Sequence, residues 1–547
     1  MNRSIFTNWI VGFLTLGGCW QLSRLAYCEV VVESASSRVD RMLSEEIFAQ
    51  LSPGELAPLT DDLTFLRRVW LDLLGKIPPS DEMTAFERSR DPQKRGKLVD
   101  RLLEDPDFGR NWGRYWRDVI LYRRTEERAM ATSSILTEYL AQHLQANTGW
   151  DQIAREFITA TGEVRHNGNT GIIMAQAGEP ENVAAEVARI FMGIQIQCAQ
   201  CHDHPYDGWK RQQFHELAAF FPRVAVRRVR TMGERGFQVV ADDQPLRRRK
   251  KGNRRGRGTL EHYMPDLENP TAPGQLIQPA LFATGQKLDM GTMDVNRRGK
   301  LSQWLTSPEN EWFSKALVNR IWSELVGEGF VEPIDDLGPD REVNAPRTFD
   351  RLSTEFAHNG YDVKWLFRTI MATEAYQRES RPRRQSAEPP FTANRPQPLR
   401  SDQLFDVFLQ VMDSGESTPT RRSRRNMGKR GRNSPRMTFQ KEFGFDPSQA
   451  RKEVVASISQ ALVLMNSSQV NRAIHGGKPW GLGKWLREIV NDRELVHQLY
   501  RRCLAREPTA HETKICVAYV KGTGDRRVAF EDILWSLVNS SEFRYRI

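Results

Sequence analysis

The spacing of apolar residues predicts helices along most of the chain. Residues 61–76 carry apolar side chains every three or four positions, at Leu63, Leu66, Val69, Trp70 and Leu73. This spacing is the period of one face of an α-helix. Gly75 and Pro78 predict its end, because glycine accepts the left-handed conformation that closes a helix and proline does not continue one.

The same period recurs in two blocks. The first block predicts helices at 81–89, 182–201 and 212–221. The second predicts helices at 311–326, 361–373, 402–412, 454–465, 485–490 and 530–543. Strand patterns are few, so the sequence predicts a mainly α fold with minor β structure.

The length of 547 residues exceeds what one hydrophobic core usually supports and favours two domains. We expect a helical domain at 36–225 and a helical partner domain at 276–545. The stretch 226–275 between them is basic and rich in Gly and Pro, which is typical of a linker or insertion, and it contains the pattern of one β-hairpin.

The N-terminus predicts export. Arg3 precedes an apolar stretch from Trp9 to Trp20, which is shorter than a bilayer span. Residues 1–28 therefore have the pattern of a signal peptide, or of a lipoprotein signal whose Cys19 would be acylated. We expect a periplasmic or envelope protein that touches a membrane only through such a lipid anchor.

The net charge of +10 comes from two short segments. Residues 247–257 hold eight Lys and Arg, and residues 421–432 hold seven, without any acid. Without these fifteen, 64 basic residues face 69 acidic ones. Such runs are usually solvated loops, and a polyanion contact is the alternative. Neither run contains an aromatic residue for base stacking, so we expect no specific nucleic-acid binding.

The sequence Cys198-Ala199-Gln200-Cys201-His202 has the C-x-x-C-H spacing of c-type haem attachment. If the helix at 182–201 continues through it, both thiols lie on one turn and reach the two vinyl groups along one porphyrin edge. His202 then becomes the proximal iron ligand. We expect a haem cavity of several hundred Å³ beside this turn.

Two other interpretations of this motif remain open. A Cys pair with His202, His204 or His215 is also typical of zinc sites, and the two cysteines could form a small disulfide. The distal haem ligand is not assigned. The residues considered for it are Met174, His166, Met232, His262, Met264, Met290 and Met293.

The rest of the chain offers no catalytic motif, so whether the protein is an enzyme stays open. Cys503 and Cys516 lie on either side of a predicted helical turn, where a disulfide and two free thiols are equally consistent with the sequence. The acidic pair Asp335-Asp336 is interpreted as a cap of a helix or turn.

Three segments of the first half resemble a known family: LRRVWLDLLGKIPPSDEMTAF, LVDRLLEDPDFGRNWGRYWRDV and IQIQCAQCHDHPYDGWKRQQFHELAAFF. They are similar to the secreted cytochrome-like domain of planctomycetes, whose function is unknown. The second half resembles its C-terminal partner domain in RRGKLSQWLTSPENEWFSKALVNRIWSELVGEGFVEPIDDLG, SISQALVLMNSSQV and FEDILWSLVNSSEF.

This resemblance implies an exported bacterial protein with Cys198, Cys201 and His202 at the haem site. It also implies that Asp203, His204, Pro205 and Asp207 belong to an extended motif around that site. We therefore expect a c-type haem protein with an electron-transfer or redox role at the cell envelope and an unidentified redox partner. The alternative is a non-enzymatic envelope or scaffold protein whose Cys-His site holds zinc or a disulfide.

Overall fold

The computed structural model describes most of the chain from residue 33 onward. The described residues are 33–52, 54–231, 234–243, 260–269, 271–385, 388–413, 435–449, 451, 454, 457–466 and 468–547. The predicted signal at 1–28, both basic runs and Met232 lie outside these residues. Residues Ala35–Ile547 form one compact unit.

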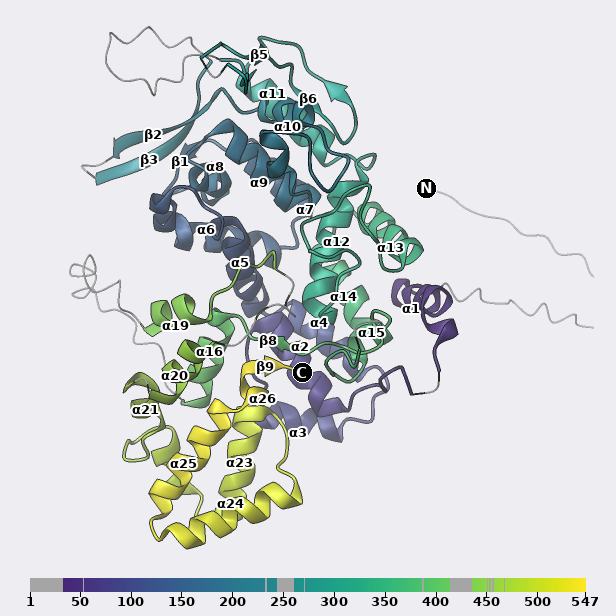
Figure 1. Cartoon of the computed structure of the whole chain (residues 1–547). Coiled ribbons are helices and arrows are strands. Elements are labelled where there is room, and N and C mark those ends of the chain that lie inside the picture. The colour runs from purple at the N-terminus through teal and green to yellow at the C-terminus, as the bar shows by residue number, and fades with distance from the viewer. Residues whose placement is uncertain are drawn as a thin grey trace, which may run out of the picture. The chain divides into compact units, whose positions relative to one another are not determined.

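The prediction of a mainly α fold is confirmed (Figure 1). The first helices are α1 (Ala35–Glu46), α2 (Asp62–Leu74), α3 (Ser80–Arg88), α4 (Lys94–Leu103), α5 (Pro106–Leu121), α6 (Ser133–Gln145), α7 (Trp150–Ile158), α8 (Gly171–Ala175), α9 (Pro180–Met192) and α10 (Arg211–Ala218). Short 3-10 helices are η1 (Phe48–Gln50), η2 (Glu127–Thr132), η3 (Gly168–Thr170) and η4 (Ile196–Gln200).

The second half is helical as well. It contains α11 (Asp294–Leu305), α12 (Glu311–Val326), α13 (Pro346–His358), α14 (Val363–Ala372), α15 (Glu374–Gln377), α16 (Ser401–Val411), α19 (Pro435–Phe443), α20 (Ile458–Asn466), α21 (Ser468–Ile474), α22 (Leu482–Glu488), α23 (Asp492–Leu504), α24 (Ala510–Thr523), α25 (Arg526–Asn539) and α26 (Ser541–Arg544). None of the described helices combines the length and apolar character that crossing a bilayer requires.

The β structure of the described residues consists of one three-stranded antiparallel sheet and three two-stranded ones. The strands are β1 (Gly162–Glu163), β2 (Val224–Thr231), β3 (Glu234–Ala241), β4 (Tyr263–Met264), β5 (Gln275–Leu276), β6 (Ala280–Leu281), β7 (Gln286–Lys287), β8 (Gln397–Pro398) and β9 (Tyr545–Arg546). β2 and β3 form the predicted hairpin, and β1 pairs with the other edge of β3. The hairpin is therefore tied to the helical part that precedes it.

Local sequence signals explain where several helices begin and end. Asp61 caps α2, because its Oδ1 accepts hydrogen bonds from the Leu63 and Thr64 amides at 2.9 and 3.0 Å. Gly75 ends the helix in the left-handed conformation, as predicted. α12 occupies the predicted residues 311–326 and ends at Gly327, whose φ is 92°.

The predicted helix at 182–201 is wrong at its C-terminal end. α9 stops at Met192, because Gly193 adopts φ 66° and turns the chain. The Gly193 carbonyl accepts a hydrogen bond of 2.7 Å from the Leu337 amide. A Cβ at Gly193 would lie 2.8 Å from Leu337 Cδ1, so this approach needs glycine. The cysteine motif lies on η4 instead, beyond the end of α9.

A buried cluster of charges joins α9 to α12 and to the loop that follows α12. Arg189 donates hydrogen bonds to Glu186 Oε1 and Oε2, to Asp335 Oδ2, to Ser448 Oγ and to the Val119 carbonyl, at 2.6 to 3.1 Å. Its five N–H donors are thereby all used.

Arg320 of α12 pairs with the other oxygen of the Asp335 carboxylate. Burial alone would raise the pKa of Asp335, but the Arg320 and Arg189 guanidiniums outweigh it and hold this pKa below its usual value. Asp336 pairs with Arg341 at 2.7 Å. The interpretation of Asp335-Asp336 as a cap is therefore wrong for Asp335, which is the central acid of a buried ion cluster.

Asp335→Ala is expected to destabilise the fold by about 3–5 kcal/mol, because it leaves Arg320 buried without its carboxylate. The free energy of unfolding in denaturant at pH 7 measures this loss. The matched control is Asp350→Ala, which removes an exposed partner of Lys315 and should cost about 1 kcal/mol or less.

The difference in the free energy of unfolding between Asp335→Ala and the wild type should also become smaller below about pH 4. The folded pKa of Asp335 is depressed, so its contribution is present above the unfolded pKa and is lost as the pH falls through the folded one. Equal losses for the two variants would contradict the central role of Asp335.

Candidate metal centre

The Cys198–His202 motif lies on η4 and the turn that follows it. Ile196 and Ala199 are buried and anchor this turn in the core. Cys198 and Cys201 are both exposed, free thiols, and His202 is exposed beside them. The turn thus presents all three predicted site residues to solvent.

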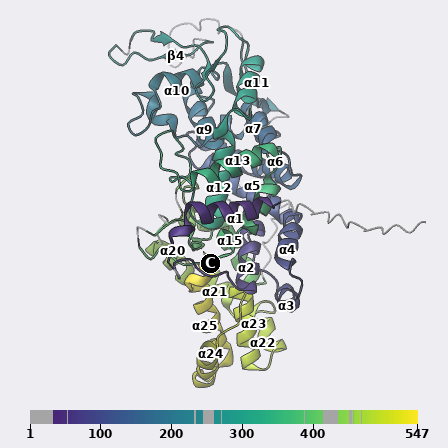
Figure 2. The ribbon, with the colours of Figure 1, turned by 90° about the vertical axis from the view of Figure 1, so that its right-hand side faces the viewer.

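The peptide between the two cysteines is held by α10. The Gln200 carbonyl accepts hydrogen bonds from His215 Nε2 at 3.0 Å and from Arg211 Nε at 3.3 Å. Asp203 Oδ1 accepts the Arg211 amide at 3.0 Å, at the first turn of α10. α9 and α10 lie side by side in both views (Figures 1 and 2). The backbone of the motif is therefore fixed while its cysteine side chains remain accessible.

The His202 ring is oriented by one backbone contact. Its Nδ1 lies 2.7 Å from the Asp203 carbonyl oxygen. A carbonyl oxygen only accepts, so Nδ1 carries the proton and Nε2 keeps its lone pair in the neutral ring. This is the tautomer that a histidine ligating through Nε2 requires. The hydrogen bond from the Arg211 amide, together with Lys210, lowers the pKa of Asp203, so a carboxylate stands next to this histidine.

Behind the motif, His215 and His262 form a buried pair that sequence reasoning did not connect. His215 Nδ1 lies 2.8 Å from His262 Nε2, and the rings stack with centroids 5.1 Å apart. Because His215 Nε2 donates to Gln200, His215 Nδ1 accepts and His262 Nε2 donates. Burial lowers the pKa of each histidine to about 4, so both are neutral at pH 7.

Glu261 positions His262. Its carboxylate accepts hydrogen bonds from Arg223 at 2.7 Å and from Arg297 of α11 at 2.8 and 2.9 Å. Arg297 is itself fully buried and also donates to the Ala219 carbonyl at the end of α10. These ion pairs fix residues 261–262 against α10, and the His262–His215 contact carries this support to Gln200.

The loop after the motif is anchored through Asp207 and Trp209. Asp207 is buried, and its Oδ2 lies 3.6 Å from Arg341 Nε. Gly338 makes this approach possible, since a Cβ there would lie 1.6 Å from Asp207 Oδ2. Trp209 packs edge-on against Phe282, with ring centroids 4.9 Å apart. The extended motif thus docks on the loop after α12.

The two further histidines of the zinc interpretation do not converge with the cysteines. Both ring nitrogens of His215 are already engaged, and His204 Nδ1 lies 3.4 Å from the Tyr206 amide. Among the residues that the structure describes, no group of three or more His, Cys, Asp or Glu side chains could hold a metal ion. Zinc with three protein ligands would require these side chains to move.

The donor set of the motif fits a c-type haem, since two accessible thiols and one correctly protonated imidazole are what this group needs from the protein. The sequence also predicted a haem cavity beside this turn. Two cavities of about 620 and 160 Å³ are lined by residues of other segments, without Cys198, Cys201 or His202. Because Cys198, Cys201 and His202 are all exposed, a haem on this turn would lie on an open face.

The distal-ligand candidates occupy different environments. Met174 is buried in the core at 1% exposure, and His262 is paired with His215. The remaining described candidates are exposed or half-buried: His166, Met264, Met290 and Met293. The distal ligand stays unassigned.

The sequence left open whether Cys503 and Cys516 form a disulfide or remain free thiols. In this structure both are free thiols. Cys503 is fully buried, and burial raises the pKa of its thiol. Cys516 is half-buried, and burial raises its pKa as well, although a hydrogen bond with Tyr500 opposes the shift.

The site and fold together define a helical protein with an exposed Cys-x-x-Cys-His turn. The chain contains the PSCyt2 domain, a protein of unknown function (DUF1549), at residues 38–226. The PSD1 domain, a protein of unknown function (DUF1553), follows at residues 297–520. These are the two domains expected from the sequence, in the same order. No curated protein and no solved structure matches the chain.

Exposure should separate the cysteines by reactivity. In folded protein produced without haem-ligation machinery, iodoacetamide is expected to modify Cys198 and Cys201 within minutes, whereas Cys503 should react only after unfolding because its thiol is buried and its pKa raised. Peptide mass mapping measures the modification at each position. Equal protection of Cys198 and Cys503 would show that the motif is covered.

The His215–His262 pair should make stability depend on pH. The folded pKa values are about 4 and the ordinary value is 6.5, so the unfolded chain binds more protons between them. Stability is therefore lost as the pH falls from 6.5 toward 4, and the pair is expected to account for a loss on the order of 2–4 kcal/mol between pH 7 and pH 5.

Denaturant unfolding at both pH values tests this expectation. The double variant His215→Leu/His262→Leu should show a smaller difference between pH 7 and pH 5 than the wild type. His511→Gln, at an exposed position, is the control and should leave the difference unchanged. An unchanged difference in the double variant would contradict the buried, neutral state of the pair.

Proposed function

We propose that the protein is an exported c-type haem protein with an electron-transfer role at the cell envelope. In this proposal the Cys198 and Cys201 thiols add across the two vinyl groups of the haem, and His202 Nε2 is the proximal iron ligand. The observation that carries the proposal is the hydrogen bond from His202 Nδ1 to the Asp203 carbonyl, which leaves Nε2 free beside two accessible thiols.

The frame around the motif supports covalent attachment. α10 fixes the Gln200 carbonyl through His215 and Arg211, so it restrains the backbone between the thiols rather than the thiols themselves. The side chains that would bond to the group are therefore held at a defined spacing and remain reactive. Bound haem would supply a one-electron redox centre to this surface.

The exposure of the turn suits exchange of electrons with a partner. A haem on an open face presents an edge to solvent, and solvent exposure is one of the factors that set its reduction potential. The redox partner is unidentified. We further propose an envelope location, with a lipid anchor at Cys19 as the only membrane contact and the two basic runs as polyanion contacts, without specific nucleic-acid binding.

A second candidate is a non-enzymatic envelope or scaffold protein whose motif holds zinc or a disulfide. The observation in its favour is that the cavities of about 620 and 160 Å³ do not adjoin the motif, so neither of them could enclose a haem bound there. In that case purified protein would contain stoichiometric zinc or a Cys198–Cys201 disulfide and no iron.

Expression in a bacterial periplasm together with the haem-ligation machinery tests the first proposal. The purified protein should show a Soret band and a haem mass that survives denaturation. Cys198→Ser/Cys201→Ser should abolish the covalent pigment, and His202→Ala should alter the iron spectrum because it removes the proximal ligand.

The matched control is Cys503→Ser/Cys516→Ser, which removes the other two described free thiols and should retain the pigment. Far-UV circular dichroism verifies that each variant folds. A colourless wild-type protein with unmodified Cys198 and Cys201 would overturn the haem proposal.

A further inference from the structure

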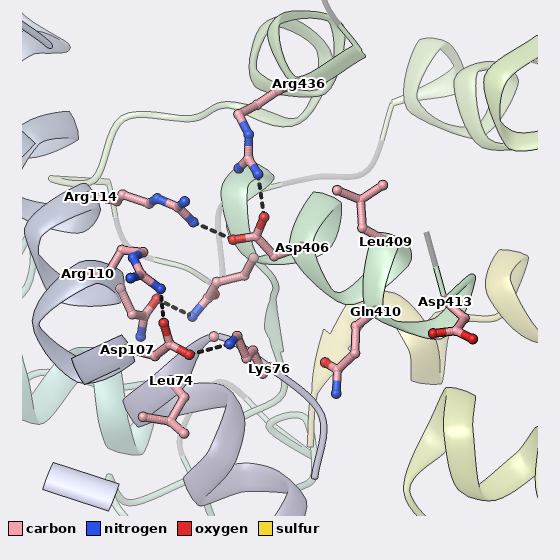
Figure 3. Close-up of a pocket in the computed structure, with 13 residues that line it drawn as sticks. Leu74, Lys76, Asp107, Arg110, Arg114, Asp406, Leu409, Gln410, Asp413 and Arg436 are labelled. Carbon is pink, nitrogen blue, oxygen red and sulfur yellow. Dashed lines mark hydrogen bonds and ion pairs between the residues drawn. The ribbon is translucent and has the colours of Figure 1, made fainter. Parts of the chain in front are cut away.

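A polar cavity of about 620 Å³ lies between the end of α2 and the helices α5, α16 and α19 (Figure 3). Its size is within the range of ligand sites, which is about 300–1,000 Å³. The described residues that line it combine basic, acidic and amide side chains with two leucines and one glycine.

Charged groups dominate this wall. Asp406 of α16 forms ion pairs with Arg114 of α5 and Arg436 of α19. Figure 3 shows the two guanidiniums approaching it from different helices. Asp406 thus carries one negative charge, while the two guanidiniums that pair with it carry two positive charges. The two arginine side chains are each about one-fifth exposed and line the cavity, so both guanidiniums are partly accessible from it.

A second arrangement of the same kind lines the same cavity. Asp107, close to the start of α5, pairs with both Lys76 and Arg110. The two clusters together carry a surplus of two positive charges, and Asp413 offsets one of them. The described lining therefore has a net positive charge. Among the described residues, Arg114 donates one hydrogen bond, to Asp406, and Arg110 donates one, to Asp107, of the five that a guanidinium offers.

Hydrogen bonds to backbone hold the amide side chains of the wall in place. Gln410 accepts the Ile77 amide at 3.0 Å and donates to the Ile77 carbonyl at 2.7 Å. Asn111 donates to the Asp72 and Leu73 carbonyls, each at 3.0 Å. Gly75 has φ 67°, and a Cβ there would lie 2.8 Å from Asn111 Oδ1. This side of the cavity is therefore preorganised, which lowers the entropic cost of binding.

We propose that this cavity binds a small hydroxylated oxyanion, of the class of sugar phosphates and sugar acids. The oxyanion would lie against Arg114 and Arg436, whose planar guanidiniums recognise phosphate and carboxylate oxygens. The ligand's hydroxyl groups would donate to Asp413 or Asp107. None of the described lining residues has an aromatic ring that could stack on a base. Leu74 and Leu409 are the only described lining residues with an apolar side chain.

This inference does not depend on the haem proposal, because the cavity shares no residue with the Cys198–His202 turn. Titration calorimetry of the wild-type protein at low salt tests it, with glucose 6-phosphate and glucuronate as probes and glucose as the neutral comparison. Both anionic probes, or one of them, should bind with a dissociation constant below about 1 mM, and glucose should not. Which anion binds more tightly distinguishes a phosphate site from a carboxylate site.

Substitutions of opposite sign separate a binding role from a structural one. Arg114→Gln is expected to weaken binding about tenfold or more, because it removes a charge-assisted hydrogen bond. Asp406→Asn should instead tighten binding severalfold, since it removes a negative charge beside the anion. The matched control Arg351→Gln removes an exposed arginine paired with Glu355 and should leave affinity unchanged.

Thermal unfolding verifies that each variant is folded. If Arg114→Gln does not fold, Arg110→Gln replaces it, because that arginine is 57% exposed and should weaken binding in the same direction. The proposal is overturned if neither anion binds with a dissociation constant below about 1 mM. Equal binding of glucose, or the same loss of affinity in Arg351→Gln, would overturn it as well.

Discussion

The buried pairing of Arg189 with Asp335 and Arg320 is the constraint on which the placement of the motif depends. Arg189 lies on the last turn of α9, immediately before the chain turns at Gly193 toward η4. All five of its donors are used, and Asp335 lies between two guanidiniums. Charges buried in this way are costly to separate, because each unpaired partner would remain in a medium of low dielectric. The end of α9 is therefore held in one position against the loop after α12, and η4 begins from a fixed point.

A second set of contacts reaches the same turn from the opposite direction. Glu261 is paired with Arg223 and Arg297, which fixes the neighbouring His262. His262 then contacts His215, and His215 donates to the Gln200 carbonyl. Glu261 and His262 are neighbours in the chain, and every other link is a hydrogen bond or ion pair between groups distant in sequence. The pair of histidines remains neutral at pH 7, so it supports the turn without placing a positive charge beneath it.

Local signals in the sequence were sufficient for much of the fold. The bounds of α12, the hairpin of β2 and β3, and the end of α2 at Gly75 all follow from periodicity and from residues adjacent in the chain. The motif Cys198–His202 was likewise readable from spacing. The end of α9 was not, because Gly193 turns in response to Leu337, which is distant in sequence. The His215–His262 contact had no local signature either. One signal was present for the ion cluster: Arg189 interrupts the apolar face of a helix, and such a charge needs a buried partner.

The support around Cys198 and Cys201 acts on the backbone, and this bears on what the turn can hold. A structural zinc site is usually closed by side chains that converge on the ion, and the described side chains here do not converge. A covalently attached group differs, because the bonds to sulfur hold it and the protein needs to supply only a fixed spacing and one imidazole. The Gln200 carbonyl is fixed from behind, and His202 is oriented by Asp203. A rigid backbone turn with accessible thiols and one imidazole therefore suits a covalently attached group on an open surface. It is less suited to a metal ion, which needs side chains that enclose it.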